Sequence, residues 1–167
     1  MNKSLLLRLV TLSLSLLLSG PVAADSDQQD WPKQPSRLKL STPYGQLHVS
    51  QSDYVYDARL LLNGEETKPP VMGLLNIPYA FSATDYHVAL ISIDSGDDSC
   101  PINYKWILLE SSGYDISDAF GSCSEQIRVF ADNHLFTMQT PNLEQPDKID
   151  TYIFDGETVV AQPFADS

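Results

Sequence analysis

The sequence predicts an all-β protein, built as an antiparallel sandwich or an open, flattened barrel of about nine short strands. Two observations lead to this class. No long stretch after Ala24 repeats its apolar residues at helical spacing. The apolar segments are instead short, rich in Val, Ile, Tyr and Phe, and separated by turn residues, a pattern typical of consecutive antiparallel strands.

The first predicted strands lie between residues 46 and 77. Gln46 to Ser50 comes first, followed by Tyr54 to Leu62, in which Tyr54 and Tyr56 would share one face of the strand. The second segment ends at Asn63-Gly64, which favours a two-residue type I′ hairpin turn. Val71 to Ile77 is flanked by prolines, which confine a strand to the edge of a sheet.

The middle of the chain predicts the centre of the sheet. Tyr86 to Asp94 is nearly all apolar, as in a strand buried on both faces, and Tyr104 to Glu110 is its expected partner. In that partner strand Tyr104 and Trp106 share one face. A short, mixed segment from Tyr114 to Phe120 follows.

Two hairpins are predicted near the end of the chain. Each consists of two short apolar segments around a turn signal, Asp132-Asn133-His134 in the first and Asp155-Gly156 in the second. The segments are Gln126 to Ala131 with Leu135 to Gln139, and Thr151 to Phe154 with Thr158 to Val160.

Residues 1–24 are typical of a secretory signal peptide. Lys3 and Arg8 provide the positive start, Leu9 to Leu18 is the apolar run, and Val22-Ala23-Ala24 offers small residues before the cleavage point. The run is shorter than the roughly 20 residues that span a bilayer. We therefore expect export to the periplasm or the medium, a flexible tether over residues 25–36, and a single β domain over 37–167.

The charge of the chain is strongly negative. Its 22 acids against 10 bases give a formal charge of -12, and removal of Lys3 and Arg8 with the signal peptide would bring this to -14. Nucleic-acid binding needs clustered Lys and Arg, so this class of function is excluded. A partner with a basic surface is the expectation that the charge favours.

Cys100 and Cys123 are the only cysteines in the chain. In an exported protein such a pair predicts one disulfide, here closing a loop of about 24 residues. A redox-active pair usually has two residues between its cysteines, and a zinc site needs more ligands at closer spacing. The structural disulfide is therefore favoured, and no metal or cofactor is predicted.

Catalytic motifs are weak. The sequence has no Gly-x-Ser-x-Gly elbow, and His48, His87 and His134 are scattered over predicted strands and a turn. A pair of carboxyl groups in a deep cleft would suit glycoside hydrolysis. The acids lie mostly in predicted turns, however, where exposure to water leaves their acidity close to that of free carboxyl groups. We therefore predict a protein that is not an enzyme.

Asp94, Asp97 and Asp98 cluster around Gly96. Carboxylates gathered in this way could bind Ca²⁺, although the spacing departs from that of the twelve-residue EF-hand loop. A polar loop between two strands is the alternative, and the sequence leaves both open.

Two short motifs flank the cysteines. Cys100-Pro101 is followed by Tyr104, and Phe120-Gly121 precedes Cys123-Ser124. The pattern resembles a group of exported proteobacterial β-domains with Cys-Pro-x-x-Tyr followed by Phe-Gly-x-Cys-Ser. The resemblance implies an all-β fold and the disulfide, and it implies no catalytic residue.

Taken together, these features predict an exported binding domain. Its partner would be a basic, envelope-acting enzyme or toxin, for which this chain would serve as an inhibitor or immunity-type protein. A small envelope glycan hydrolase and a structural or accessory envelope module are the alternatives. The candidate partner contacts, chosen as loop residues near the disulfide, are Asp94, Asp97, Asp98, Tyr114 and Asp115.

Overall fold

The computed structural model describes residues 31–162 and 164. The predicted signal peptide and the first part of the predicted tether, residues 25–30, lie outside them. The described residues form twelve β-strands and no helix, which confirms the predicted all-β class with more strands than the sequence indicated. A helix long and apolar enough to cross a membrane is accordingly not found in this part of the chain.

The strands form three four-stranded antiparallel sheets, each a meander that follows chain order. The first sheet contains β1 (Lys39–Thr42), β2 (Gly45–Val49), β3 (Leu60–Leu62) and β4 (Glu65–Glu66). The middle sheet contains β5 (Leu74–Ser82), β6 (Tyr86–Asp94), β7 (Ile102–Glu110) and β8 (Gly113–Ile116). The third sheet contains β9 (Arg128–Asp132), β10 (Leu135–Pro141), β11 (Ile149–Phe154) and β12 (Val159–Gln162).

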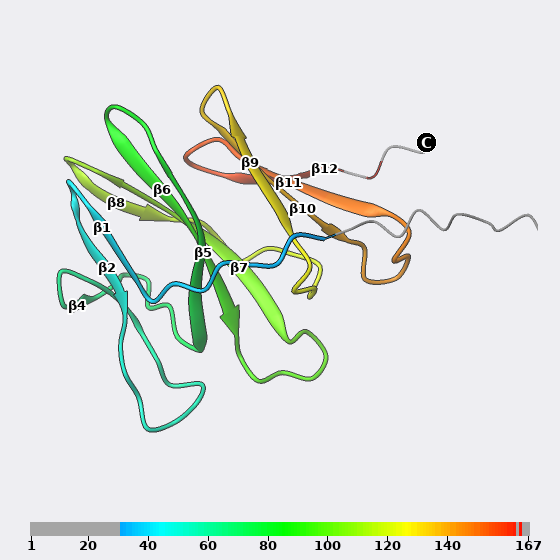
Figure 1. Ribbon diagram of the computed structural model, residues 1–167, viewed down its shortest axis with the longest axis horizontal. Coiled ribbons are helices and arrows are strands. Elements are labelled where there is room, and N and C mark those ends of the chain that lie inside the picture. Colours follow the sequence, from blue (N-terminus) through cyan, green and yellow to red (C-terminus); the bar gives the residue numbers. More distant parts are fainter. Residues whose placement is uncertain (1–30, 163, 165–167) are drawn as a thin grey trace, which may run out of the picture.

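The middle sheet packs against both of the others, so that the molecule has three layers (Figure 1). Successive side chains of a strand point to opposite faces. On β6, Leu90 therefore enters the core shared with the third sheet, whereas Ile91 enters the core shared with the first. Trp106 and Ile107 divide in the same way on β7.

Aromatic rings fill the core between the middle and third sheets. Trp106 is fully buried and stacks on Phe154, with ring centroids 5.8 Å apart and planes 8° from parallel. Phe120 stacks on Trp106 as well, at 6.5 Å and 18°, and Phe136 packs at a tilt, 5.7 Å away. Each such pair adds about 0.5–1.5 kcal/mol to the burial of its apolar surface.

The predicted central strands and turns are confirmed. Strand β6 has the predicted bounds, β7 is its partner, and Tyr104 and Trp106 share the face that is buried against the third sheet. Positive φ angles of 53° at Asn63 and 89° at Gly64 place the first hairpin turn in the left-handed region that a type I′ turn requires.

The predicted strand from Tyr54 to Leu62 is wrong in its first half. Only Leu60–Leu62 forms a strand, and the residues before it form a loop. Short polar side chains explain the difference, because they bind backbone groups that a strand would pair. The Ser52 hydroxyl accepts a hydrogen bond from the Tyr54 N–H at 3.2 Å, and that of Ser50 accepts one from the Arg59 N–H at 2.8 Å.

The segment ahead of β1 is bound to the edge of β5. The Arg37 N–H donates to Asn76 Oδ1 at 2.7 Å, and Asn76 Nδ2 donates to the Pro35 carbonyl at 3.1 Å. The Ile77 N–H donates to the Arg37 carbonyl at 2.9 Å. Strand β5 lies at a sheet edge as predicted, although it begins three residues later and ends five residues later than Val71 to Ile77 and contains a bulge between Asn76 and Tyr79.

Because both cores share one sheet, we expect them to unfold together. Leu90→Ala and Ile91→Ala each remove a buried side chain, one from each core, and should lower the free energy of unfolding by about 2–5 kcal/mol. Urea denaturation followed by tryptophan fluorescence and circular dichroism measures this. Val160→Ala, at an exposed position, is the control and should cost about 0.5 kcal/mol or less. If the Ile91→Ala variant unfolded in two separate transitions, this would contradict the expectation that the two cores unfold together.

Candidate functional site

An apolar groove of about 810 Å³ opens where the first sheet meets the middle sheet. We define it by Leu38, Val49, Tyr54, Val55 and Leu74, which line it together with neighbouring residues of the 50–58 loop. Leu38 precedes β1, Val49 ends β2 and Leu74 begins β5. The groove therefore combines segments that are separated in the sequence.

The side chains of the groove are unusually exposed for their type. The exposed fraction is 73% for Tyr54, 62% for Val55, 54% for Leu38 and 50% for Leu74. Single exposed apolar residues are common on protein surfaces, but several that line one concavity are typical of a binding surface. This arrangement makes the groove the candidate functional site.

Backbone hydrogen bonds fix both ends of the loop that forms one wall of the groove. The Ser50 N–H donates to the Arg59 carbonyl at 2.8 Å, and the Gly73 N–H donates to the Ala58 carbonyl at 3.0 Å. Within the loop, the Asp57 N–H donates to the Tyr54 carbonyl at 3.2 Å and closes a turn. The exposed Tyr54 and Val55 therefore stand on an anchored loop.

An acidic loop borders the groove. We use this name for residues 94–101, which include Asp94, Asp97 and Asp98. Asp94 lies directly opposite Leu74 in the pairing of β5 with β6. The ring of Tyr56 packs so closely on Gly96 that a Cβ there would lie 2.8 Å from a ring carbon. The apolar groove and the acidic loop are thus parts of one surface.

The acidic loop is ordered by its own carboxylates. The Gly96 N–H donates to Asp94 Oδ1 at 2.8 Å, and both the N–H and the hydroxyl of Ser99 donate to Asp97 Oδ1, at 2.9 and 2.7 Å. The hydrogen bonds from Ser99, led by that of its hydroxyl, hold the pKa of Asp97 below its usual value. Asp97 therefore keeps its negative charge over the whole neutral range.

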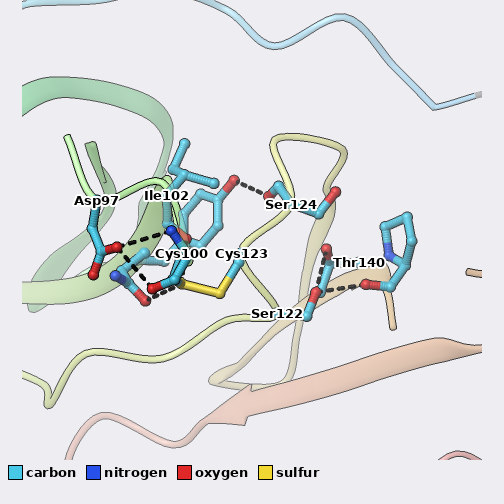
Figure 2. Close-up of a disulfide and its surroundings, with 11 residues drawn as sticks. Asp97, Cys100, Ile102, Ser122, Cys123, Ser124 and Thr140 are labelled. Carbon is cyan, nitrogen blue, oxygen red and sulfur yellow. Dashed lines mark hydrogen bonds between the residues drawn. A yellow bond between two sulfur atoms is a disulfide. The ribbon is translucent and has the colours of Figure 1, made fainter. Parts of the chain in front are cut away.

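The predicted disulfide between Cys100 and Cys123 is confirmed, with the two Cα atoms 4.7 Å apart. It ties the acidic loop to the segment that follows Phe120 (Figure 2). The Tyr104 hydroxyl donates to the Ser124 carbonyl at 2.8 Å beside it. The acidic loop is therefore covalently joined to the segment that leads into the third sheet.

The structure brings the three predicted aspartates together but places the other two candidates elsewhere. Tyr114 and Asp115 lie on β8, opposite Leu109 and Leu108, towards the end of the middle sheet that is far from Asp94. The Tyr114 hydroxyl accepts a hydrogen bond from the Lys68 N–H at 2.7 Å. The five residues therefore do not form a single surface.

Sequence reasoning missed the apolar groove. Tyr54 and Val55 fell within a predicted strand, and Leu38 and Leu74 come from segments that only the fold brings close. A usable signal was present in the loop sequence itself. Ser50, Ser52 and Asp53, which precede Tyr54, are residues that favour turns over strands.

The described residues contain no group of three or more His, Cys, Asp or Glu side chains that could hold a metal ion. Of the histidines, His48 lies in β2 and His87 in β6, while His134 contacts the Tyr86 hydroxyl.

Asp155 is the second aspartate whose pKa is lowered. Hydrogen bonds, chiefly from the Thr158 and Glu157 N–H groups, have this effect on its carboxyl group.

Comparison of the chain with protein-family models, with curated proteins and with solved structures finds no match in any of the three.

Removal of the disulfide should weaken the fold. For a closed loop of this length the chain-entropy model gives about 3.5 kcal/mol, so Cys100→Ser with Cys123→Ser should lower the free energy of unfolding by about that amount. Urea denaturation of the variant and of the wild type, each with and without reductant, measures the loss. The reductant should affect only the wild type, and an equal effect on both proteins would contradict the assignment.

Tyr104 should make the protein sensitive to alkali. Burial, with the Glu125 charge as a smaller cause, raises the pKa of its hydroxyl far above 10. A group whose pKa is raised on folding contributes stability below its unfolded pKa, and this is lost as the pH rises past about 10. Denaturation of the wild type and Tyr104→Phe between about pH 9 and 12 should show the steeper decline in the wild type, by up to about 1.4 kcal/mol per pH unit. Parallel declines would contradict this.

Proposed function

We propose that the chain is an exported binding domain that holds a basic protein partner across the apolar groove and the acidic loop. The observation that carries the proposal is the contact between two kinds of surface. Leu74, which lines the groove, lies opposite Asp94, and the ring of Tyr56 from the 50–58 loop packs on Gly96 in the acidic loop. An inhibitor or immunity-type protein for a basic, envelope-acting enzyme fits this combination best.

The apolar groove and the acidic loop would have different roles in binding. Protein interfaces are apolar at the centre and polar at the rim, and tyrosine is enriched among the residues that contribute most to binding. The groove would supply the centre. The acidic rim would accelerate and orient the approach of a basic partner, an effect that salt weakens because it acts through solvent.

Export is part of the proposal. The signal-peptide pattern of residues 1–24 and the disulfide both suit an oxidising compartment outside the cytoplasm. The carboxyl groups of Asp97 and Asp155 do not suit the acid role in the alternative function, glycan hydrolysis. Both have lowered pKa values, whereas the acid of a glycosidase needs a raised one.

The test is affinity capture from a cell-envelope extract, with bound proteins eluted by raising NaCl from about 0.05 to 0.5 M. The wild type should retain a basic protein that elutes with salt, and titration calorimetry with that purified protein then gives its affinity. Tyr54→Ala should weaken binding at least about tenfold, as expected for a central aromatic contact. Asp53 also lines the groove, and Asp53→Asn combined with Asp98→Asn in the acidic loop should chiefly slow association and flatten its salt dependence.

A charge-matched control separates the local rim from the overall charge. Asp85→Asn with Asp115→Asn removes the same charge from the far end of the middle sheet, where Asp85 precedes β6 and Asp115 lies on β8. This variant should bind like the wild type. Equal weakening by the two double variants, or full binding by Tyr54→Ala, would contradict the proposed surface.

A further inference from the structure

We propose that a small polar pocket on the middle sheet binds a primary alkylammonium ion. The pocket has a volume of about 270 Å³. Its walls come from residues 34–36, from strands β5, β6 and β7, and from Glu125 and Ile127 ahead of β9. It shares no lining residue with the apolar groove, so this ligand site goes beyond the proposed function.

A row of three polar side chains crosses the middle sheet at the pocket. Asn76 lies opposite Ser92, and Ser92 lies opposite Tyr104, so the three share one face of the sheet. The next row on this face contains Leu90 and Trp106, which belong to the core shared with the third sheet. The pocket therefore lies where this face of the sheet changes from apolar to polar.

The hydrogen bonds already present in this row determine what it can offer a ligand. Tyr104 is 1% exposed and donates its hydroxyl proton to a backbone carbonyl, so its oxygen can only accept. Asn76 uses both ends of its amide on backbone groups of the segment ahead of β1. Ser92 is 8% exposed, and its hydroxyl has no partner among the described residues.

Gln34 adds a buried acceptor. Its Nε2 donates to the Ile127 carbonyl at 2.9 Å, which fixes the orientation of the amide. Its Oε1 is buried and has no hydrogen-bond donor within the described part of the chain. A buried oxygen without a donor costs free energy, and an N–H group of a ligand that reached this atom would remove the cost.

Glu125 supplies negative charge. Its carboxylate lines the pocket and has no ion pair with any residue that the structure describes. Burial, and after it the charge of Glu125, raise the pKa of the Tyr104 hydroxyl, which indicates that the carboxylate lies near this oxygen. Lys, Arg and His are absent from the described residues that line the pocket, so this negative charge is not compensated there.

These groups select a cationic hydrogen-bond donor. A primary ammonium has three N–H donors and a positive charge, which suit the oxygens of Gln34, Tyr104 and Glu125. An anion would meet the same oxygens unfavourably. Pro78 and Ile102 add apolar wall for a short alkyl chain. The volume lies just below the range of about 300–1,000 Å³ for pockets that take drug-sized ligands, so the chain has only a few carbons.

The test is titration of the oxidised protein with n-butylammonium chloride, followed by ¹H–¹⁵N NMR. About 0.15 M NaCl weakens general attraction to the acidic surface. The amide signals of Gln34, Ser92 and Glu125 should shift and saturate with a dissociation constant of about 1 mM, as expected for so small a ligand. Tetramethylammonium has no N–H donor and n-butanol has no charge, so each should bind at least about tenfold more weakly.

Two matched variants separate the pocket from the overall charge. Glu125→Gln keeps the shape of an exposed side chain and removes its charge, so the variant should fold and bind n-butylammonium at least about tenfold more weakly. Glu65→Gln removes the same charge from β4 in the first sheet and should bind like the wild type.

Three results would overturn the proposal. The first is the absence of saturable shifts up to about 20 mM n-butylammonium, and the second is shifts confined to the acidic loop. The third is equal weakening by Glu125→Gln and Glu65→Gln, because attraction to the whole acidic surface would then account for the binding.

Discussion

The burial of the middle sheet on both faces is the constraint on which the rest of the structure depends. Strand β6 is apolar along almost its whole length, and each of its faces needs a cover. An antiparallel meander of four strands can supply one apolar face and leave the other in water. Two such meanders, one before and one after the middle sheet in the chain, complete the three-layer arrangement.

Strong local patterns account for the part of the fold that the sequence could predict. The unbroken apolar run of β6, the alternation in β7 and the turn pairs Asn63-Gly64 and Asn133-His134 each act within a few residues. Strand β1 and the two-residue β4 were not predicted, because their mixed segments become strands only by pairing with neighbours. The third layer was equally beyond prediction, since periodicity shows that a face is buried but not what covers it.

The candidate site could be predicted only in its charged half. Asp94, Asp97 and Asp98 lie within five residues of the chain, so their clustering is visible in the sequence itself. The apolar half depends on Leu38, Val49 and Leu74 meeting a loop whose tyrosines resemble a strand. These residues come together only when the first and middle sheets pack, so the sequence alone does not reveal the groove.

The segment that precedes β1 has a consequence for how the chain reaches its final state. Within each sheet, hydrogen-bonded strands are neighbours in sequence and can pair soon after both exist, whereas Gln34 is bonded to Ile127, 93 residues away. Contacts over such distances form late because they close a large loop. The beginning of the described chain is therefore expected to take its final place last, closing over sheets that have already formed.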